Sequence, residues 1–110
     1  MKVSRKPSYP LGKMKELVAA GRYKPTMRVV GFVSGRYPAD DVSAVLQEVF
    51  ASLEERDFSK SIELDKRPGT MADVYVGGCY DGQEWYVKAF IDGDELEVLI
   101  WSMCWDGCAH

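Results

Sequence analysis

The clearest periodic pattern in the chain lies between Asp40 and Leu53. Apolar side chains there recur at three- and four-residue intervals, which places them on one face of an α-helix. Asp40 or Asp41 can accept a hydrogen bond from the first free backbone amides, so we predict a capped helix that buries this face. The apolar positions are Val42, Val45, Leu46, Val49, Phe50 and Leu53.

A shorter helix is predicted after Pro10, and the segment after this helix is ambiguous. Pro10 suits a first turn, Gly21 suits a helix end, and the apolar residues between them lie on one helical face. Residues 26–35 favour a strand by their β-branched and aromatic content, but they also fit one buried helical turn. The pattern leaves both alternatives open.

From Phe58 the period of the pattern changes to two, which indicates a strand. Phe58, Ile62 and Leu64 alternate with polar residues. Lys60 falls on their apolar side, where a charged group must reach the rim of the sheet, pair with a carboxylate or line a cleft. Lys60 is therefore a candidate functional residue, although its aliphatic stem could simply cover the sheet edge.

The C-terminal half is predicted to be an antiparallel meander. After a turn at 67–69, Asp-Gly pairs at 81–82 and 92–93 mark the reversals between three alternating segments. A two-residue loop at 81–82 would place Tyr75 opposite Lys88 and bring Tyr86 onto the same face. The predicted fold is α+β, with two or three N-terminal helices packed on an antiparallel sheet of about four strands. The predicted strands are 72–80, 84–91 and 95–103, after the first at Phe58.

The composition fits one domain that spans residues 1–110. Its 46% hydrophobic content is enough for one core. Residues 1–9 and 104–110 are expected to be tails, the first of which orders only against a partner. No apolar run approaches the roughly 20 residues that cross a bilayer, and no secretory signal is recognisable, so we expect a cytoplasmic protein without membrane contact.

Charge is distributed unevenly along the chain. The first 36 residues hold nine Lys and Arg and one Glu, whereas residues 37–110 hold five basic residues and sixteen carboxylates. The basic part could bind phosphate groups, pair with the acidic part or only solvate a helix and a tail.

Histidine and cysteine chemistry is poorly supported. His110 is the single histidine and the last residue, which argues against histidine-based catalysis. The three cysteines cannot pair completely, and reduced thiols are expected. Cys104, Cys108 and His110 could ligate zinc, but their spacing matches no standard site, so a metal site there is a secondary alternative.

Lysine and tyrosine remain as candidate catalytic groups. RNA can be cleaved without histidine when cations stabilise charge on the scissile phosphate and a tyrosine or lysine moves the 2′-hydroxyl proton. The same residue types alternate on any solvated sheet face, so a plain polar surface is the competing interpretation. The candidates are Lys60, Lys66, Arg67, Tyr75, Tyr86 and Lys88.

Several segments occur in an order that is typical of one family. They are KMKELVAAGRY, the helix at 42–53, DFSKSIEL, MADVYV, GQEWYVKAFI and LEVLIWSM. Together, over about residues 13–103, they resemble the MqsR family of bacterial toxins. The most specific points are Asp57-Phe58, Lys60-Ser61, Asp73-Val74-Tyr75 and Tyr86-Val87-Lys88.

The resemblance implies a RelE-like fold in which residues 26–35 are helical. It also implies a cytoplasmic, ribosome-independent mRNA interferase that cleaves near GC-containing sequences without metal or cofactor and is neutralised by a cognate antitoxin. By the same resemblance, Lys60 and Tyr86 match the catalytic lysine and tyrosine, and Tyr75 and Lys88 would support them.

Four positions depart from the family pattern. The family's glutamine and last-strand lysine correspond to Ala72 and Cys104, and Ser59 and Met71 replace a tyrosine and a tryptophan. Loss of the lysine removes a cation that would stabilise the transition state. Lys88, Arg67 or an N-terminal arginine could substitute; otherwise the chain is a catalytically degenerate relative that acts as an antitoxin-binding module.

Overall fold

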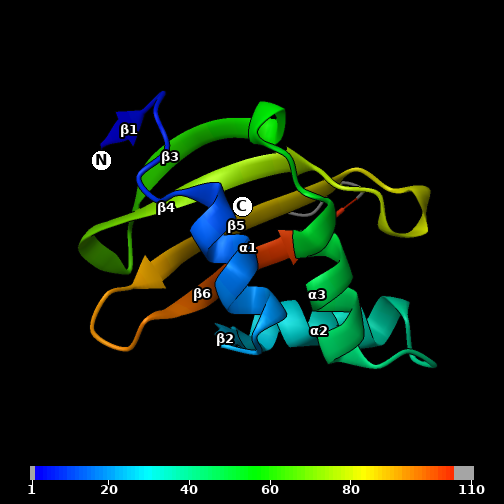
Figure 1. Cartoon of the computed structure of the whole chain (residues 1–110). Helices are drawn as coiled ribbons and strands as arrows, with labels where there is room; N and C mark the ends of the chain where they lie inside the picture. Colours follow the sequence, from blue (N-terminus) through cyan, green and yellow to red (C-terminus); the bar gives the residue numbers. More distant parts are fainter. Residues whose placement is uncertain (1, 106–110) are drawn as a thin grey trace.

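The computed structural model describes residues 2–105 and has an α+β fold (Figure 1). Within this part of the chain, three α-helices accompany a mixed sheet of six strands in the order β1-β3-β4-β5-β6-β2. Neighbouring strands are antiparallel except β2 and β6, which are parallel. The elements are β1 (Val3–Ser4), α1 (Leu11–Ala19), β2 (Tyr23–Pro25), α2 (Met27–Arg36), α3 (Val42–Ser52), the 3-10 turn η1 (Glu55–Asp57), β3 (Phe58–Leu64), β4 (Arg67–Gly77), the turn η2 (Tyr80–Gly82), β5 (Trp85–Asp92) and β6 (Glu97–Cys104).

The α+β class is confirmed, but the predicted sheet of about four antiparallel strands was too small. The four predicted strands correspond to β3 to β6, and the short strands β1 and β2 extend the sheet at its two edges. Two or three residues are too few to produce a recognisable alternation, so these edges have no signal in the sequence.

Helices α2 and α3 each begin at a residue whose side chain accepts a hydrogen bond from a backbone amide of the first turn. The Asp41 carboxylate accepts a hydrogen bond from the Ser43 amide at the start of α3. The Thr26 hydroxyl accepts one from the Val29 amide, so residues 27–36 are helical and the ambiguity of this segment is resolved in favour of α2. Gly21, with φ of 80°, follows the end of α1 as predicted.

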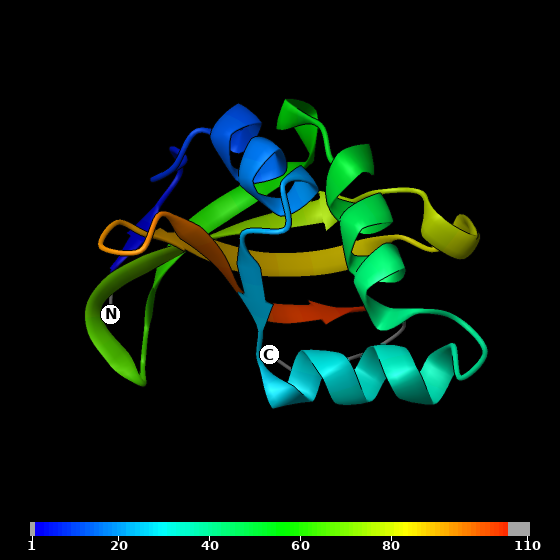
Figure 2. The same cartoon turned by 60° about the horizontal axis from the view of Figure 1, so that its bottom comes forward.

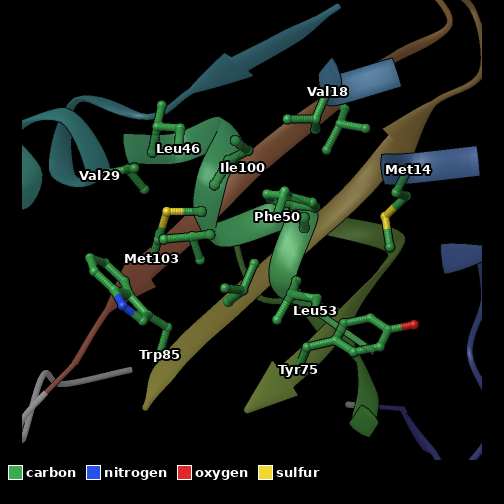
Figure 3. Close-up of a cluster of buried hydrophobic side chains, with 14 of the residues drawn as sticks. Met14, Val18, Val29, Leu46, Phe50, Leu53, Tyr75, Trp85, Ile100 and Met103 are labelled. Atoms are coloured by element: carbon green, nitrogen blue, oxygen red, sulfur yellow. The ribbon is translucent and has the colours of Figure 1, made fainter. Parts of the chain in front are cut away.

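The main core lies between one face of the sheet and helices α1 and α3, with α2 packed beside β6 (Figures 1 and 2). Figure 3 shows side chains from all three helices and from the sheet converging in this layer. Neither α1 nor α3 covers the opposite face of the sheet (Figure 2), which is called the open face below. The residues labelled in the core are Met14, Val18, Val29, Leu46, Phe50, Leu53, Tyr75, Trp85, Ile100 and Met103.

The connection between β4 and β5 is longer than predicted, and this changes the register. Asp81 and Gly82 do adopt left-handed backbone angles, with φ of 58° and 65°. They sit inside a seven-residue connection, residues 78–84, because the Tyr80 hydroxyl donates to Asp40 and the Trp85 indole donates to the Tyr80 carbonyl. The loop is therefore held against the helices and does not close as a two-residue hairpin.

The other two reversals lie close to their predicted positions. The turn between β3 and β4 is at Asp65 and Lys66, so the predicted turn residues 67–69 already belong to β4. The turn between β5 and β6 spans residues 93–96, and the Leu96 amide donates to the Asp92 carbonyl at 2.7 Å.

The N-terminal segment lies against the sheet and does not behave as the predicted tail. Residues 3 and 4 pair with β3, and the amides of Ser8 and Tyr9 donate to the buried Asp73 carboxylate at 2.9–3.0 Å. Asp73 thereby fixes the chain immediately before α1. No helix within residues 2–105 is long and apolar enough to cross a membrane.

Candidate functional site

A row of four paired residues crosses the sheet on the face away from α1 and α3. Lys60 of β3 pairs with Val74 of β4, Val74 pairs with Lys88 of β5, and Lys88 pairs with Ser102 of β6. Paired residues project to the same side of a sheet, so Lys60 and Lys88 share a face. One strand lies between them, which separates their Cα atoms by roughly 10 Å.

A β-bulge in β3 places Lys60 on this face. Phe58 pairs with Tyr75, and the next pair is Lys60 with Val74, so Ser59 is an extra residue in β3. Without the bulge, Phe58 and Lys60 would point the same way. Because of the bulge, Phe58 points into the main core and Lys60 points to the open face. Lys60 therefore lines a cleft, which was one of the predicted alternatives.

A second bulge, in β6, places the consecutive residues Trp101 and Ser102 on the same open face. Ser102 pairs with Lys88 and Ile100 pairs with Ala89, so Trp101 is the extra residue. Its ring packs against Phe90 with 6.1 Å between ring centroids, whereas Ile100 points into the main core. Bulges commonly redirect side chains beside functional sites.

Lys60, Lys88 and Trp101 line a cleft of about 500 Å³ on the open face. The turn between β3 and β4 forms one wall, and Figure 2 shows this hairpin curling away from the side of α1 and α3. Among the described lining residues, four are cationic and two are acidic, although the whole chain has a net charge of −3. The charged lining residues are Arg28, Lys60, Lys66, Lys88, Glu63 and Asp65.

Lys88 is the buried cation of this cleft. Its side chain is only 8% exposed, and burial lowers the pKa of its ammonium, as do the nearby charges of Arg28 and Lys60, whereas Asp65 raises this pKa. A lowered pKa increases the fraction of neutral amine at any given pH. Lys88 can therefore exchange a proton more readily than an exposed lysine.

Arg28, which the sequence pattern does not distinguish from the other N-terminal basic residues, reaches the cleft from α2. Its guanidinium donates to the Ser102 hydroxyl at 3.2 Å and to the Trp101 carbonyl at 3.4 Å. It thereby extends the row of cations beyond Lys88. The sequence gives little reason to choose Arg28. It is one of nine basic residues in the first third of the chain, and its segment is ambiguous between helix and strand.

Tyr86 lies two residues before Lys88 on β5, so both side chains are on the same face of the sheet. It pairs with Val76 and with Cys104, and its side chain is partly exposed. Burial raises the pKa of the phenol above its usual value of 10, so Tyr86 is protonated at neutral pH and can donate a hydrogen bond. Its Cα atom lies roughly 12 Å from that of Lys60 by sheet geometry, which both long side chains can bridge through a substrate.

Tyr75 does not join this site, and the predicted Tyr75–Lys88 pairing is wrong. Tyr75 pairs with Val87, one residue away from the predicted register, and a shift of one residue exchanges the two faces of a strand. Its ring is buried in the main core, 5.6 Å from the Phe58 ring (Figure 3). Burial, assisted by the Asp73 charge, raises the pKa of Tyr75 to about 12.

The remaining predicted residues take different places. Lys66 lines the cleft from the β3–β4 turn. Arg67 is not among the described residues that line it; its guanidinium lies over the Phe90 ring at 5.0 Å. Ala72 is fully buried and Cys104 is 7% exposed, so neither position supplies the polar group that the family resemblance implies there.

The secondary zinc hypothesis falls mainly outside the described residues, because Cys108 and His110 lie beyond residue 105. Within residues 2–105 no group of three His, Cys, Asp or Glu side chains is arranged to hold a metal ion. Cys79 is an exposed free thiol, but Cys104 is disulfide-bonded, so the expectation of reduced cysteines is wrong for Cys104.

A second cleft, of about 480 Å³, lies between η1 and the β4–β5 connection. Among its described lining residues, Glu54, Asp57 and Glu84 outnumber Arg56. This negative charge disfavours a polyanion, in contrast to the cleft at Lys60 and Lys88.

The cleft at Lys60 and Lys88 thus combines cations with an aromatic side chain, and Tyr86 lies on the same face of the sheet, two residues before Lys88 on β5 and outside the described lining of the cleft. Comparison of the chain with models of known protein families and with curated proteins finds no match.

Proposed function

We propose that this chain is an endoribonuclease of the mRNA-interferase class, with the RelE-like fold of the MqsR toxins that its sequence resembles. The observation that carries the proposal is the cationic cleft on the open face of a sheet in an otherwise acidic chain. A phosphate group would enter between Lys60, Lys88 and Arg28, where electrostatic attraction is concentrated by the cleft walls.

The chemistry is transfer of a phosphoryl group within the RNA strand. A 2′-hydroxyl loses its proton, its oxygen attacks the adjacent phosphorus, and the bond from phosphorus to the 5′-oxygen breaks. The leaving 5′-oxygen takes up a proton. The products are a 2′,3′-cyclic phosphate and a 5′-hydroxyl, so the reaction consumes no further reactant.

The protein groups suit separate parts of this reaction. Lys88, with its lowered pKa, can accept the 2′-hydroxyl proton as a neutral amine, and Tyr86, with its raised pKa, can donate a hydrogen bond or proton to the phosphate or the leaving oxygen. Lys60 and Arg28 stabilise the charge that develops on the phosphoryl oxygens. In this assignment Arg28 takes the place of the cation missing at Cys104.

The proposal includes the biological setting of such toxins. The protein would act in the cytoplasm on mRNA and would be neutralised by a cognate antitoxin protein. The alternative is a degenerate relative that only binds the antitoxin; the observation that favours this alternative is the apolar Ala72 beneath the cleft and the lack of a cation at Cys104.

Expression of the chain in bacterial cells without its antitoxin tests the proposal. RNA ends mapped after induction should fall at a short common sequence and should disappear in Lys60→Ala and Tyr86→Phe. Lys13→Ala, an exposed lysine on α1, and Tyr75→Phe, whose ring lies in the main core away from the cleft, are matched controls that should cleave like the wild type. Intact RNA in cells that contain soluble wild-type protein would overturn the enzymatic proposal, and antitoxin binding without cleavage would support the alternative.

A further inference from the structure

Trp101 has a position that packing alone does not require. It is the extra residue of the β6 bulge, it lines the cationic cleft, and it remains partly exposed beside Lys88 and Ser102. A regular strand would place residue 101 on the opposite side from Ser102. Because of the bulge, the large aromatic side chain of Trp101 lies on the same face as the row that contains Lys60 and Lys88.

The groups around Trp101 suit a nucleotide. The Arg28 guanidinium donates to the Trp101 carbonyl at 3.4 Å, which keeps a phosphate-binding group next to the indole. Phe90 packs against the ring at an angle of 51° and holds it from below within a small apolar cluster. An indole that is supported on one side and open to a cationic cleft is the usual arrangement for stacking a base while cations hold the backbone.

We propose that Trp101 is a stacking platform for an unpaired nucleobase, so that the cleft takes single-stranded RNA. The proposal rests on the proposed function, since it assumes that RNA occupies the cleft. Base pairs in a duplex keep their faces covered by neighbouring pairs, so only a splayed or single-stranded base can lie on the indole. The phosphate beside that base would then lie over Lys88 and Arg28.

Binding can be measured separately from cleavage with RNA whose 2′-oxygens are methylated, because such RNA cannot make the attack. Labelled single strands of mixed sequence and the corresponding duplex are titrated against wild type, Trp101→Phe and Trp101→Leu. Leucine fills most of the volume over Phe90 but has no aromatic face. Leu96→Ala, which removes an exposed apolar side chain from the nearby β5–β6 turn, is the control.

Trp101→Leu should weaken single-strand binding by about 5- to 150-fold, the range expected for one base stacked on an aromatic ring, and should leave the weaker duplex binding unchanged. Trp101→Phe should retain most of the affinity, and Leu96→Ala all of it. Equal single-strand affinity of Trp101→Leu and wild type, or an equal loss for single strand and duplex, would overturn the proposal.

A photocrosslinking measurement on wild-type protein avoids dependence on a folded variant. Single-stranded RNA that contains 5-bromouridine should form an adduct on Trp101, identified by mass spectrometry, whereas adducts found only elsewhere contradict stacking. The two proposals fail differently. Cleavage that depends on Lys60 together with unchanged binding by Trp101→Leu removes the stacking proposal alone, and Trp101-dependent binding without cleavage by wild type removes the enzymatic proposal alone.

Discussion

Replacement of Lys88 by methionine should stabilise the fold while it abolishes cleavage. The Lys88 side chain is 8% exposed, and burial together with the charges of Arg28 and Lys60 lowers the pKa of its ammonium. Methionine keeps an unbranched chain of similar length in contact with the same neighbours but carries no charge. The substitution therefore removes an unfavourable buried cation without opening a cavity.

The pH dependence of the gain follows from the direction in which folding shifts the pKa of Lys88. Each unit by which folding lowers the pKa of Lys88 reduces the free energy of unfolding by about 1.4 kcal/mol at neutral pH, because the lysine is charged there in the unfolded chain. We expect Lys88→Met to be about 1 kcal/mol or more stable than wild type at pH 7. Between the folded pKa and the reference value of 10.5, the unfolded chain binds more protons, so wild-type stability rises with pH and the advantage of the variant shrinks.

Urea unfolding at pH 7 and above pH 10.5 measures this difference, and the matched control is Lys60→Met. Lys60 lies in the same row of the sheet but is exposed, so its replacement should change stability by no more than about 0.5 kcal/mol. Both variants should lose RNA cleavage. If Lys88→Met proves less stable than wild type at pH 7, the attraction of the ammonium to Asp65 outweighs burial and the reasoning is wrong.

Three further substitutions test separate parts of the structure. Tyr86→Phe should lower the cleavage rate by about 10²- to 10³-fold, as for loss of a donor to a developing charge, whereas Tyr75→Phe should leave the rate unchanged in the same gel assay. Gly77→Ala should cost about 1–3 kcal/mol in urea unfolding, because its Cβ atom would overlap the Asp57 carboxyl group. Asp73→Ala should cost about 3 kcal/mol and increase amide exchange at residues 8 and 9, and slow exchange there in the variant would refute the anchoring role.

The hydrophobic pattern predicted the helices better than the sheet. The helix at 42–53 has five buried apolar residues on one face, and a local aspartate caps it, so all of its signals are close in sequence. The choice of helix for residues 27–36 depended on the family resemblance, because Val29, Val30 and Val33 suit either structure. The packing of Val29 and Val33 in the core is a tertiary contact that periodicity does not contain.

The composition of the site could be predicted only in part, because two bulges and one loop decide which side chains share a face. Lys60, Tyr86 and Lys88 were candidates from residue type, and they do share the open face. Tyr75 was assigned to the wrong face because the loop after β4 is held by Tyr80 and does not form a two-residue turn. A register shift of one residue between β4 and β5 leaves almost no mark on an alternating pattern, but it changes which side chains share a face.

Arg28 and Trp101 illustrate a second limit of the pattern. Arg28 belongs to a helix that is distant in sequence from the strands, and it enters the site only because α2 packs beside β6. In the sequence, Trp101 fits the ordinary alternation of apolar and polar residues along the strand. Only the bulge in β6 places its side chain on the same face as that of Ser102. Contacts between distant segments and extra residues in strands are determined by packing across the whole sheet.

The most direct test of the cleft as an RNA-cleaving site is incubation of purified protein with single-stranded RNA, followed by analysis of the new ends. We expect fragments that carry a 2′,3′-cyclic phosphate and a 5′-hydroxyl, no cut where the nucleotide before the scissile bond is 2′-deoxy, and no fragments from Lys60→Ala. Fragments with a 3′-hydroxyl and a 5′-phosphate, or equal cleavage by folded Lys60→Ala, would contradict it.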